Sequence, residues 1–192
     1  MFEKNGVDYS YTENRELSWL KFNLRVLEEA DCEDAPAFER LKFISIFTSN
    51  LDEFYMVRVG SLYDLALAGD DEPDNKSGMT CSEQLDAIFD RTPELCRKKD
   101  ESYARVADAL AKQHICRPSY NDLTSSEKKF VEKYFKKSIL PLLSPQIVDN
   151  MHPFSHLDNK RLYIAAVLRH GKNCCYGLIP VSPSESRIGP MP

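Results

Sequence analysis

The residues best suited to chemistry lie where the sequence reads Ser49-Asn50-Leu51-Asp52. Ser49 followed three positions later by an acidic residue is a variant of the helix capping box, so a helix is expected to begin here. Asn50 would then occupy the first helical position, beside unpaired N–H groups and the positive end of the helix dipole. Such a position attracts phosphates, and the Asn50 amide can donate to and accept from a base or a sugar. A polar residue that only helps to cap the helix is the commoner origin of this pattern.

A second candidate is a group of lysines on one face of a helix expected after residue 124, namely Lys129, Lys133, Lys136 and Lys137. Lys and Arg charge is the main means by which proteins hold chains of phosphates, so this face could bind a polyanion. A solvated helix face produces the same pattern more often, and the sequence leaves both explanations open.

Other catalytic and metal-binding patterns are missing. The sequence has no glycine-rich phosphate loop, no nucleophile elbow and no HExxH motif. His152 and His156 have the spacing of a helical metal pair, but Pro153 between them favours a turn. The six cysteines include no CxxC pair and are interpreted as reduced thiols. We therefore expect no catalytic residue and no metal site in this chain.

Helices are expected to position the Asn50 region. Ser18 is expected to cap the first helix, and residues 34–36 mark the start of the second. The helix that begins at Asn50 is expected to end at Gly69, and residues 70–78 form a polar, solvated loop.

A long helical pattern follows. Thr80 and Glu83 form a capping box, and apolar residues then recur until Ile115 with spacings near 3.5. This pattern predicts an antiparallel helical hairpin or the edge of a bundle. Pro93 lies inside it, so we expect either a kink or a division into two helices there.

The character of the chain changes after a boundary near residues 116–123. Thr124 begins a short amphipathic helix whose apolar face is expected to be buried; that face comprises Phe130, Val131, Tyr134 and Phe135. Two strands are expected at residues 161–169 and 174–180, joined by a four-residue loop in which Gly171 can adopt positive φ. Two strands do not make a stable sheet alone, so this second region is expected to be incomplete.

The composition is that of a globular protein whose two regions differ in net charge. Its 192 residues are 42% hydrophobic and 29% charged, and no apolar run approaches the roughly 18 residues that span a bilayer. The N-terminus lacks the apolar segment of a secretory signal, so a cytoplasmic location is expected.

Residues 117–192 carry 11 Lys and Arg against 6 Asp and Glu, whereas residues 1–116 carry 14 against 24. Two regions with different partners would show this split.

Two stretches closely resemble the opening of the polyphosphate kinase family. They are residues 16–30, ELSWLKFNLRVLEEA, and residues 41–59, LKFISIFTSNLDEFYMVRV, and each mixes aromatic, polar and charged positions over a long run. The resemblance continues through residues 130–135, 139–145 and 152–154. It implies a mainly α chain, with a helical N-terminal domain at residues 1–118 and the start of an incomplete α/β (α+β) head domain at residues 119–192.

The resemblance also implies a function. That family passes the terminal phosphate of ATP to inorganic polyphosphate through a phosphohistidine, with Mg²⁺, and dimerises through its head domain. Its nucleotide pocket lies mainly in C-terminal domains, and the N-terminal domain closes over it. The family's nucleotide-contacting asparagine falls on Asn50 here, which favours a nucleotide-binding role for that residue over capping alone.

The family's phosphorylated histidine and magnesium ligands lie in C-terminal domains that no segment of this chain resembles. The resemblance therefore implies ATP or ADP and polyphosphate as partners of a complete enzyme, a homo-oligomer through the head domain, and no nucleic acid. This chain alone is expected to be inactive and to bind no cofactor tightly. A non-catalytic helical module for interaction or dimerisation requires the same residues and stays open as an alternative.

Overall fold

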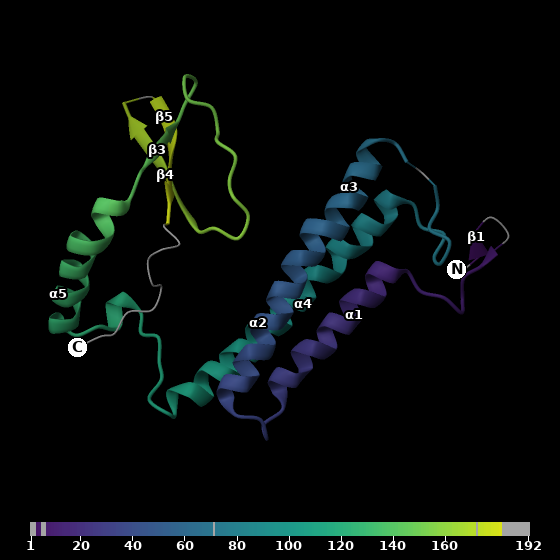
Figure 1. Ribbon diagram of the computed structural model, residues 1–192, viewed down its shortest axis with the longest axis horizontal. Coiled ribbons are helices and arrows are strands. Elements are labelled where there is room, and N and C mark those ends of the chain that lie inside the picture. Colours follow the sequence, from purple (N-terminus) through teal and green to yellow (C-terminus); the bar gives the residue numbers. More distant parts are fainter. Residues whose placement is uncertain (1–2, 5–6, 71, 172, 182–192) are drawn as a thin grey trace. The chain divides into compact units, whose positions relative to one another are not determined.

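The computed structural model describes residues 3–4, 7–70, 72–171 and 173–181. It forms two compact units, Met1–Cys116 and Arg117–Pro192 (Figure 1). The described part of the chain is mainly helical, with helices throughout the first unit and a small antiparallel sheet in the second.

The first unit is a packed set of helices preceded by a short hairpin. Its elements are β1 (Glu3–Lys4), β2 (Val7–Asp8), α1 (Arg15–Glu28), a 3₁₀ turn (Glu29–Asp31), α2 (Ala37–Phe54), a π-helical turn (Tyr55–Val59), α3 (Gly60–Leu67) and α4 (Cys81–Ala111). Among the described residues, no helix is long and apolar enough to cross a membrane.

The first helix begins at Asn14 and not at Ser18, so the predicted cap was wrong. The Asn14 side-chain oxygen accepts from the backbone N–H groups of Glu16 and Leu17 at 3.0 and 3.1 Å. Asn14 is only 3% exposed, and the N–H of Ser18 already donates to its carbonyl. A better and more buried cap therefore starts the helix one turn earlier.

The helix start predicted at residues 49–52 was also wrong, because α2 runs through this segment without a break. Buried apolar residues recur along α2 on both sides of the segment, at Ile44, Phe47 and Phe54. Packing of this stripe keeps the helix continuous, and Ser49 is an exposed residue in its interior. The irregularity comes later: the N–H of Gly60 donates to the carbonyl of Tyr55, five residues back, as in a π-helix.

The end of α3 at Gly69 is confirmed. Gly69 has φ 75°, its N–H donates to the carbonyl of Ala66, and the N–H of Asp70 donates to the carbonyl of Leu65. This is a Schellman motif, which needs the positive φ that glycine adopts without steric cost.

The capping box of α4 is confirmed, with Thr80 and Glu83 each bonding the other's backbone N–H. Division of α4 at Pro93 was wrong, since the helix continues to Ala111. Ile88 and Leu95, on either side of the proline, are 0% and 7% exposed. Their burial in the core holds both halves in one helix and offsets the hydrogen bond that proline cannot make.

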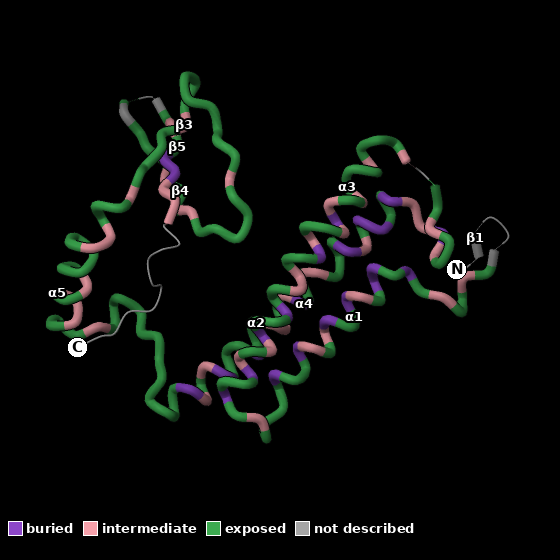
Figure 2. The backbone as a smooth tube through the Cα atoms, in the orientation of Figure 1, coloured by how far each residue is buried: buried purple, intermediate pink, exposed green. Residues whose placement is uncertain are grey.

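The core of the first unit lies between α1, α2 and α4, as the buried segments in Figure 2 show. Its largest fully buried apolar side chains are Phe47, Leu20, Leu27, Ile88 and Val106. Full burial of one such side chain contributes about 1.5–3 kcal/mol, so these contacts hold the helices that form the site described below.

The second unit combines one helix with a three-stranded sheet. Its elements are α5 (Ser125–Tyr134), a π-helical turn (Phe135–Ile139), a 3₁₀ turn (Leu140–Leu142), β3 (Gln146–Val148), β4 (Tyr163–His170) and β5 (Asn173–Pro180). The capping box at Thr124 is confirmed. The strands are antiparallel in the order β3-β5-β4, and β3 is a strand that the sequence did not indicate.

Two further predictions for this unit were wrong. The β4–β5 ladder extends to the pair His170–Asn173, so the connection is two residues shorter than expected, with Gly171 at φ 61°. The apolar face of α5 is not buried: Phe130 and Phe135 are 39% and 42% exposed. Hydrophobic periodicity identifies the face that requires cover, but no described element supplies that cover.

Candidate functional site

A pocket of about 320 Å³ opens on the first unit beside Asn50. Its walls come from α1, α2 and the π-helical turn; the lining residues are Trp19, Phe22, Asn50, Glu53, Phe54, Val57 and Arg58. This volume lies at the lower end of the range for small-molecule sites. Asn50 therefore lines a pocket, but from the interior of a helix and not from its electropositive start.

A hydrogen-bonded relay holds the half-buried Asn50 side chain. Its Nδ2 donates to Oδ1 of Asn23 on α1 at 3.1 Å, and Nδ2 of Asn23 donates to the carbonyl of Phe47 at 3.1 Å. Asn23 is 0% exposed. Buried polar groups of this kind are rigid when every bond is made, so Asn50 has a defined orientation at the pocket wall.

Aromatic rings form the apolar side of the pocket. Trp19 stacks on Phe54 with ring centroids 4.3 Å apart and planes at 4°. Phe54 is 3% exposed and also makes an edge contact with Tyr55, whose hydroxyl donates to that of Thr92 on α4 at 2.7 Å. The Trp19 ring is therefore fixed from behind by the core while part of it remains accessible.

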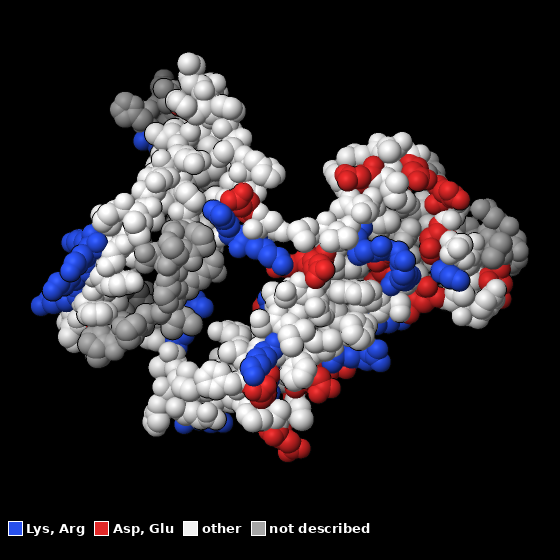
Figure 3. Space-filling view, in the orientation of Figure 1, with Lys and Arg blue, Asp and Glu red and all other residues white. Residues whose placement is uncertain are grey.

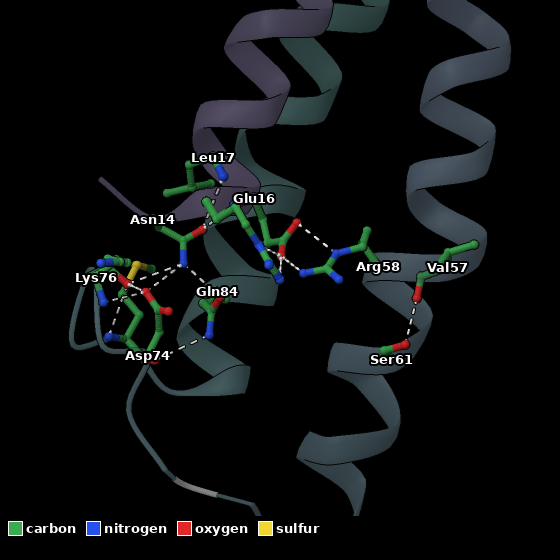
Figure 4. A network of polar contacts seen from close by, with 12 residues as sticks. Asn14, Glu16, Leu17, Val57, Arg58, Ser61, Asp74, Lys76 and Gln84 are labelled. Atoms are coloured by element: carbon green, nitrogen blue, oxygen red, sulfur yellow. Dashed lines mark hydrogen bonds and ion pairs between the residues drawn. The ribbon is translucent and has the colours of Figure 1, made fainter. Parts of the chain in front are cut away.

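The π-helical turn places Arg58 at the edge of this pocket. Arg58 Nη2 donates to Oε1 of Glu16 at 2.5 Å and Nε lies 3.4 Å from Oε2, as Figure 4 shows. The Glu16 side chain is only 6% exposed, whereas that of Arg58 is 43% exposed. A buried carboxylate needs a charged partner, so Glu16 fixes the guanidinium in place. Nη1 of Arg58 bonds none of the described residues.

A second pocket, of about 400 Å³, lies on the other side of the Glu16–Arg58 pair. Asn14 lies in its wall, where Nδ2 donates to Oε1 of Gln84 at 2.8 Å and to Ser77 and Asp74 at 3.3 and 3.4 Å (Figure 4). The loop after α3 was predicted to be solvated and unpacked. These bonds show that its second half is attached to the start of α1 instead.

The predicted lysine face borders an open depression on α5 and the π-helical turn that follows it, lined by Lys129, Glu132, Lys133, Lys136 and Lys137. All five are exposed, and Figure 3 shows the positive group along this helix. The depression belongs to the second unit, whereas the pocket at Asn50 belongs to the first. Exposed lysines fit both a solvated helix face and a face that binds a polyanion, so both explanations stay open.

The histidines form no site among the described residues, which contain no group of three or more His, Cys, Asp or Glu side chains placed to hold a metal. His152 Nδ1 lies 3.0 Å from Oδ1 of Asp149. This bond, with the backbone N–H groups of Met151 and His152, lowers the pKa of the Asp149 carboxyl. The contact stabilises a turn, in agreement with the effect expected of Pro153.

Sequence reasoning pointed to Asn50, which lines the pocket, but missed Asn23, which bonds it, and the Glu16–Arg58 pair at the pocket edge. Asn23, Glu16 and Arg58 all lie within the stretches that carry the family resemblance. Nothing in their spacing indicated that α1 and the end of α2 would bring them together. A polar residue at a core position of an amphipathic helix, as at Asn23, was the available signal.

The described molecule is thus a mainly α protein whose helical unit carries an aromatic-lined pocket of ligand size, followed by a small α+β unit. Residues 12–117 match the model of the polyphosphate kinase N-terminal domain, and residues 126–192 match that of the polyphosphate kinase middle domain. The chain belongs to the polyphosphate kinase family.

Individual relatives agree with this assignment. The chain is 47% identical over 165 residues to a polyphosphate kinase of Bacillus anthracis, covering 85% of this chain and 24% of the relative. It is 46% identical over 154 residues to that of Staphylococcus epidermidis, covering 80% and 21%. The crystal structure of polyphosphate kinase from Porphyromonas gingivalis matches with a TM-score of 0.65 at 28% identity, over 88% of this chain and 24% of that one. The chain therefore spans about a quarter of the length of these relatives.

Proposed function

We propose that this chain supplies one wall of the ATP site of a polyphosphate kinase. The observation that carries the proposal is the pocket in which Asn50, a fixed tryptophan ring and Arg58 meet. Aromatic surface with a few oriented polar groups is the usual composition of a nucleotide-base site. In this arrangement the rings of Trp19 and Phe22 cover the base and the Asn50 amide bonds its edge. Arg58 offers Nη1 to a sugar or phosphate oxygen.

In the complete enzyme, the proposal places transfer of the terminal phosphate of ATP to polyphosphate, through a phosphohistidine and with Mg²⁺, on other domains. The proposal gives this chain the role of binding and orienting the nucleotide, through the residues that line the pocket. A cytoplasmic location is part of the proposal, because ATP is present there and none of the six cysteines forms a disulfide.

Trp19 provides a direct test, since it is the single tryptophan of the sequence and lies in the pocket. Titration of the 192-residue chain with ATP, excited at the red edge of the indole band, is expected to quench its fluorescence to saturation. Asn50→Ala should weaken this binding several-fold, as expected for loss of one hydrogen bond to a neutral group. Inorganic tripolyphosphate is the matched control: equal quenching by it, or none by millimolar ATP, would contradict the proposal.

A second candidate function is assembly through the second unit. Large apolar side chains are exposed on both its helix and its sheet, including Tyr134 at 39%, Val167 at 60% and Tyr176 at 57%. Exposed apolar surface of this kind marks contact surfaces, and it supports a homo-oligomer formed through the head domain. Sedimentation over a concentration series tests this function: a monomer at every concentration would reject self-association of this chain.

A further inference from the structure

Asn23 is a buried polar residue whose two hydrogen bonds fix the orientation of its side-chain amide. It is fully buried on α1, and both ends of its amide are used: Nδ2 faces the Phe47 carbonyl and Oδ1 faces Asn50. A backbone carbonyl can only accept, so the Asn23 NH₂ group must point to Phe47. Its oxygen must then point to Asn50, which has to present NH₂ in return.

The relay consequently fixes which end of the Asn50 amide is which. Nδ2 is turned toward Asn23 and spends one N–H there, while Oδ1 bonds no described residue. Asn50 therefore offers a ligand its Oδ1 acceptor and its second N–H donor, in a set order. An isolated surface asparagine could offer the same two groups in either order, because its amide turns freely.

We propose that Asn23 is a positioning residue that fixes the Asn50 amide and so makes the pocket select a 6-amino purine over a 6-oxo purine. The inference rests on the proposed nucleotide site and deepens it. A 6-amino purine presents an N–H donor at position 6 beside a ring-nitrogen acceptor. The 6-amino group can donate to Oδ1 of Asn50, and the ring nitrogen can accept from the second N–H of Asn50. A 6-oxo purine held in the same place between the rings of Trp19 and Phe22 presents an acceptor at position 6, opposite the Asn50 oxygen.

The relay prevents the pocket from adapting to the wrong base. Turning the Asn50 amide would place its oxygen against Oδ1 of Asn23. Asn23 could respond only by turning as well, which would place its own oxygen against the Phe47 carbonyl. Either response breaks one of the two hydrogen bonds and leaves a buried pair of facing acceptors, which is costly.

The experiment compares ATP with inosine triphosphate, which differs at position 6 of the base, using Trp19 fluorescence of the 192-residue chain. The wild-type chain should bind ATP about tenfold more tightly, the discrimination typical of an oriented amide–base pair. Asn23→Leu, close in size and unable to bond, should bring the ratio of the two dissociation constants near one. In an Asn50→Ala background the same change should leave the ratio unaltered.

Tyr55→Phe is the matched control, because it removes a side-chain hydrogen bond of the same unit away from the pocket lining. It should lower the melting temperature and keep the ATP preference. If Asn23→Leu does not fold, Asn23→Ser replaces it, with a side chain too short to bridge both partners. A wild-type ratio near one, or an unchanged ratio in the Asn23 variant, overturns the inference alone. Absence of binding by either nucleotide overturns the proposed function as well.

Discussion

Glu16 and Arg58 show how one buried charge can organise a site. Among the described residues, removal of Arg58 leaves the Glu16 carboxylate, 6% exposed, with the solvent-exposed Arg15 as its one charged partner, at 3.3 Å. We expect Arg58→Ala to lower the free energy of unfolding by about 1–3 kcal/mol, the cost of an under-paired buried charge. Arg15→Ala is the matched control, and as an exposed ion pair it should cost at most about 1 kcal/mol. Urea unfolding of both variants measures the difference in the free energy of unfolding. Equal losses in the two variants would show that burial of the Glu16 carboxylate does not depend on its pairing with Arg58.

Ser49 and Asn50 are adjacent residues with opposite expected effects on stability. Ser49 is exposed in the interior of α2, so Ser49→Ala should raise stability slightly, by up to about 0.5 kcal/mol of helix propensity. Asn50→Ala leaves Oδ1 of Asn23 buried without its donor and should cost about 1–2 kcal/mol. Thermal unfolding followed by circular dichroism separates them. A loss at Ser49 equal to that at Asn50 would restore the capping assignment.

At the scale of the element, the capping box of α5 should depend on pH. Glu127 accepts from the Thr124 hydroxyl and backbone N–H, both at 2.7 Å, and these bonds lower the pKa of its carboxyl below the ordinary 4.5. Because the folded pKa is lowered, the contribution is complete above the ordinary pKa and is lost as the pH falls through the folded value.

Amide chemical shifts of residues 125–128 should therefore move toward coil values as the pH falls from the ordinary pKa of 4.5 through the lowered pKa of the folded protein. Glu127→Gln keeps the acceptor of the capping box but cannot titrate, so its shifts should stay constant over the same range. Identical pH profiles for the two proteins would contradict this assignment.

The same elements show what sequence could and could not reveal. The boxes at Thr80 and Thr124 were predictable because cap and partner lie within four residues, and nothing nearby competes. The pattern at residues 49–52 has equal local quality, yet packing of the α2 stripe on both sides prevails over it. The π-helical turn at Tyr55–Val59 has no local signature, since it follows from how α2 and α3 meet α4.

The candidate site was predictable only in part. Family resemblance indicated Asn50, whereas the physical reason given for it, an electropositive helix start, was wrong. Asn23 and the Glu16–Arg58 pair depend on contacts between α1 and residues 24 to 42 positions further along the chain. Distances of that kind become visible only once the helices are packed.

At the scale of the whole molecule, we expect the chain by itself to have no phosphotransferase activity. Incubation with γ-labelled ATP and magnesium is expected to leave no phosphohistidine, because the matched segments are the N-terminal and middle domains only. Acid-labile, base-stable label retained on the purified chain would contradict this expectation. Label on a longer polyphosphate kinase run in parallel verifies the assay.

Two loops without helix or strand should differ in their resistance to protease. Residues 149–160 are mostly exposed, whereas residues 74–79 are attached to Asn14 and Thr12 by side-chain hydrogen bonds. A protease of broad specificity should cut the first loop well before the second. Asn14→Ala should selectively speed cleavage at residues 74–79, as read by mass spectrometry. Early cutting there in the unaltered chain would contradict this.

The π-helical turn at Tyr55–Val59 determines how a change in the number of residues between α2 and α3 would affect packing of α3. Each residue of an α-helix advances the direction of a side chain by about 100°, so the turn acts as a spacer that sets the phase of α3 relative to α2. Deleting one residue from it would form an ordinary α-helix in nearly the same phase, because a π-helical turn accommodates about one extra residue. Leu62 and Ala66 would still face the core, whereas side chains inside the turn would move, and Arg58 would be carried away from Glu16. A single-residue deletion in this segment should therefore keep the packing of α3 and lose the Glu16–Arg58 pair.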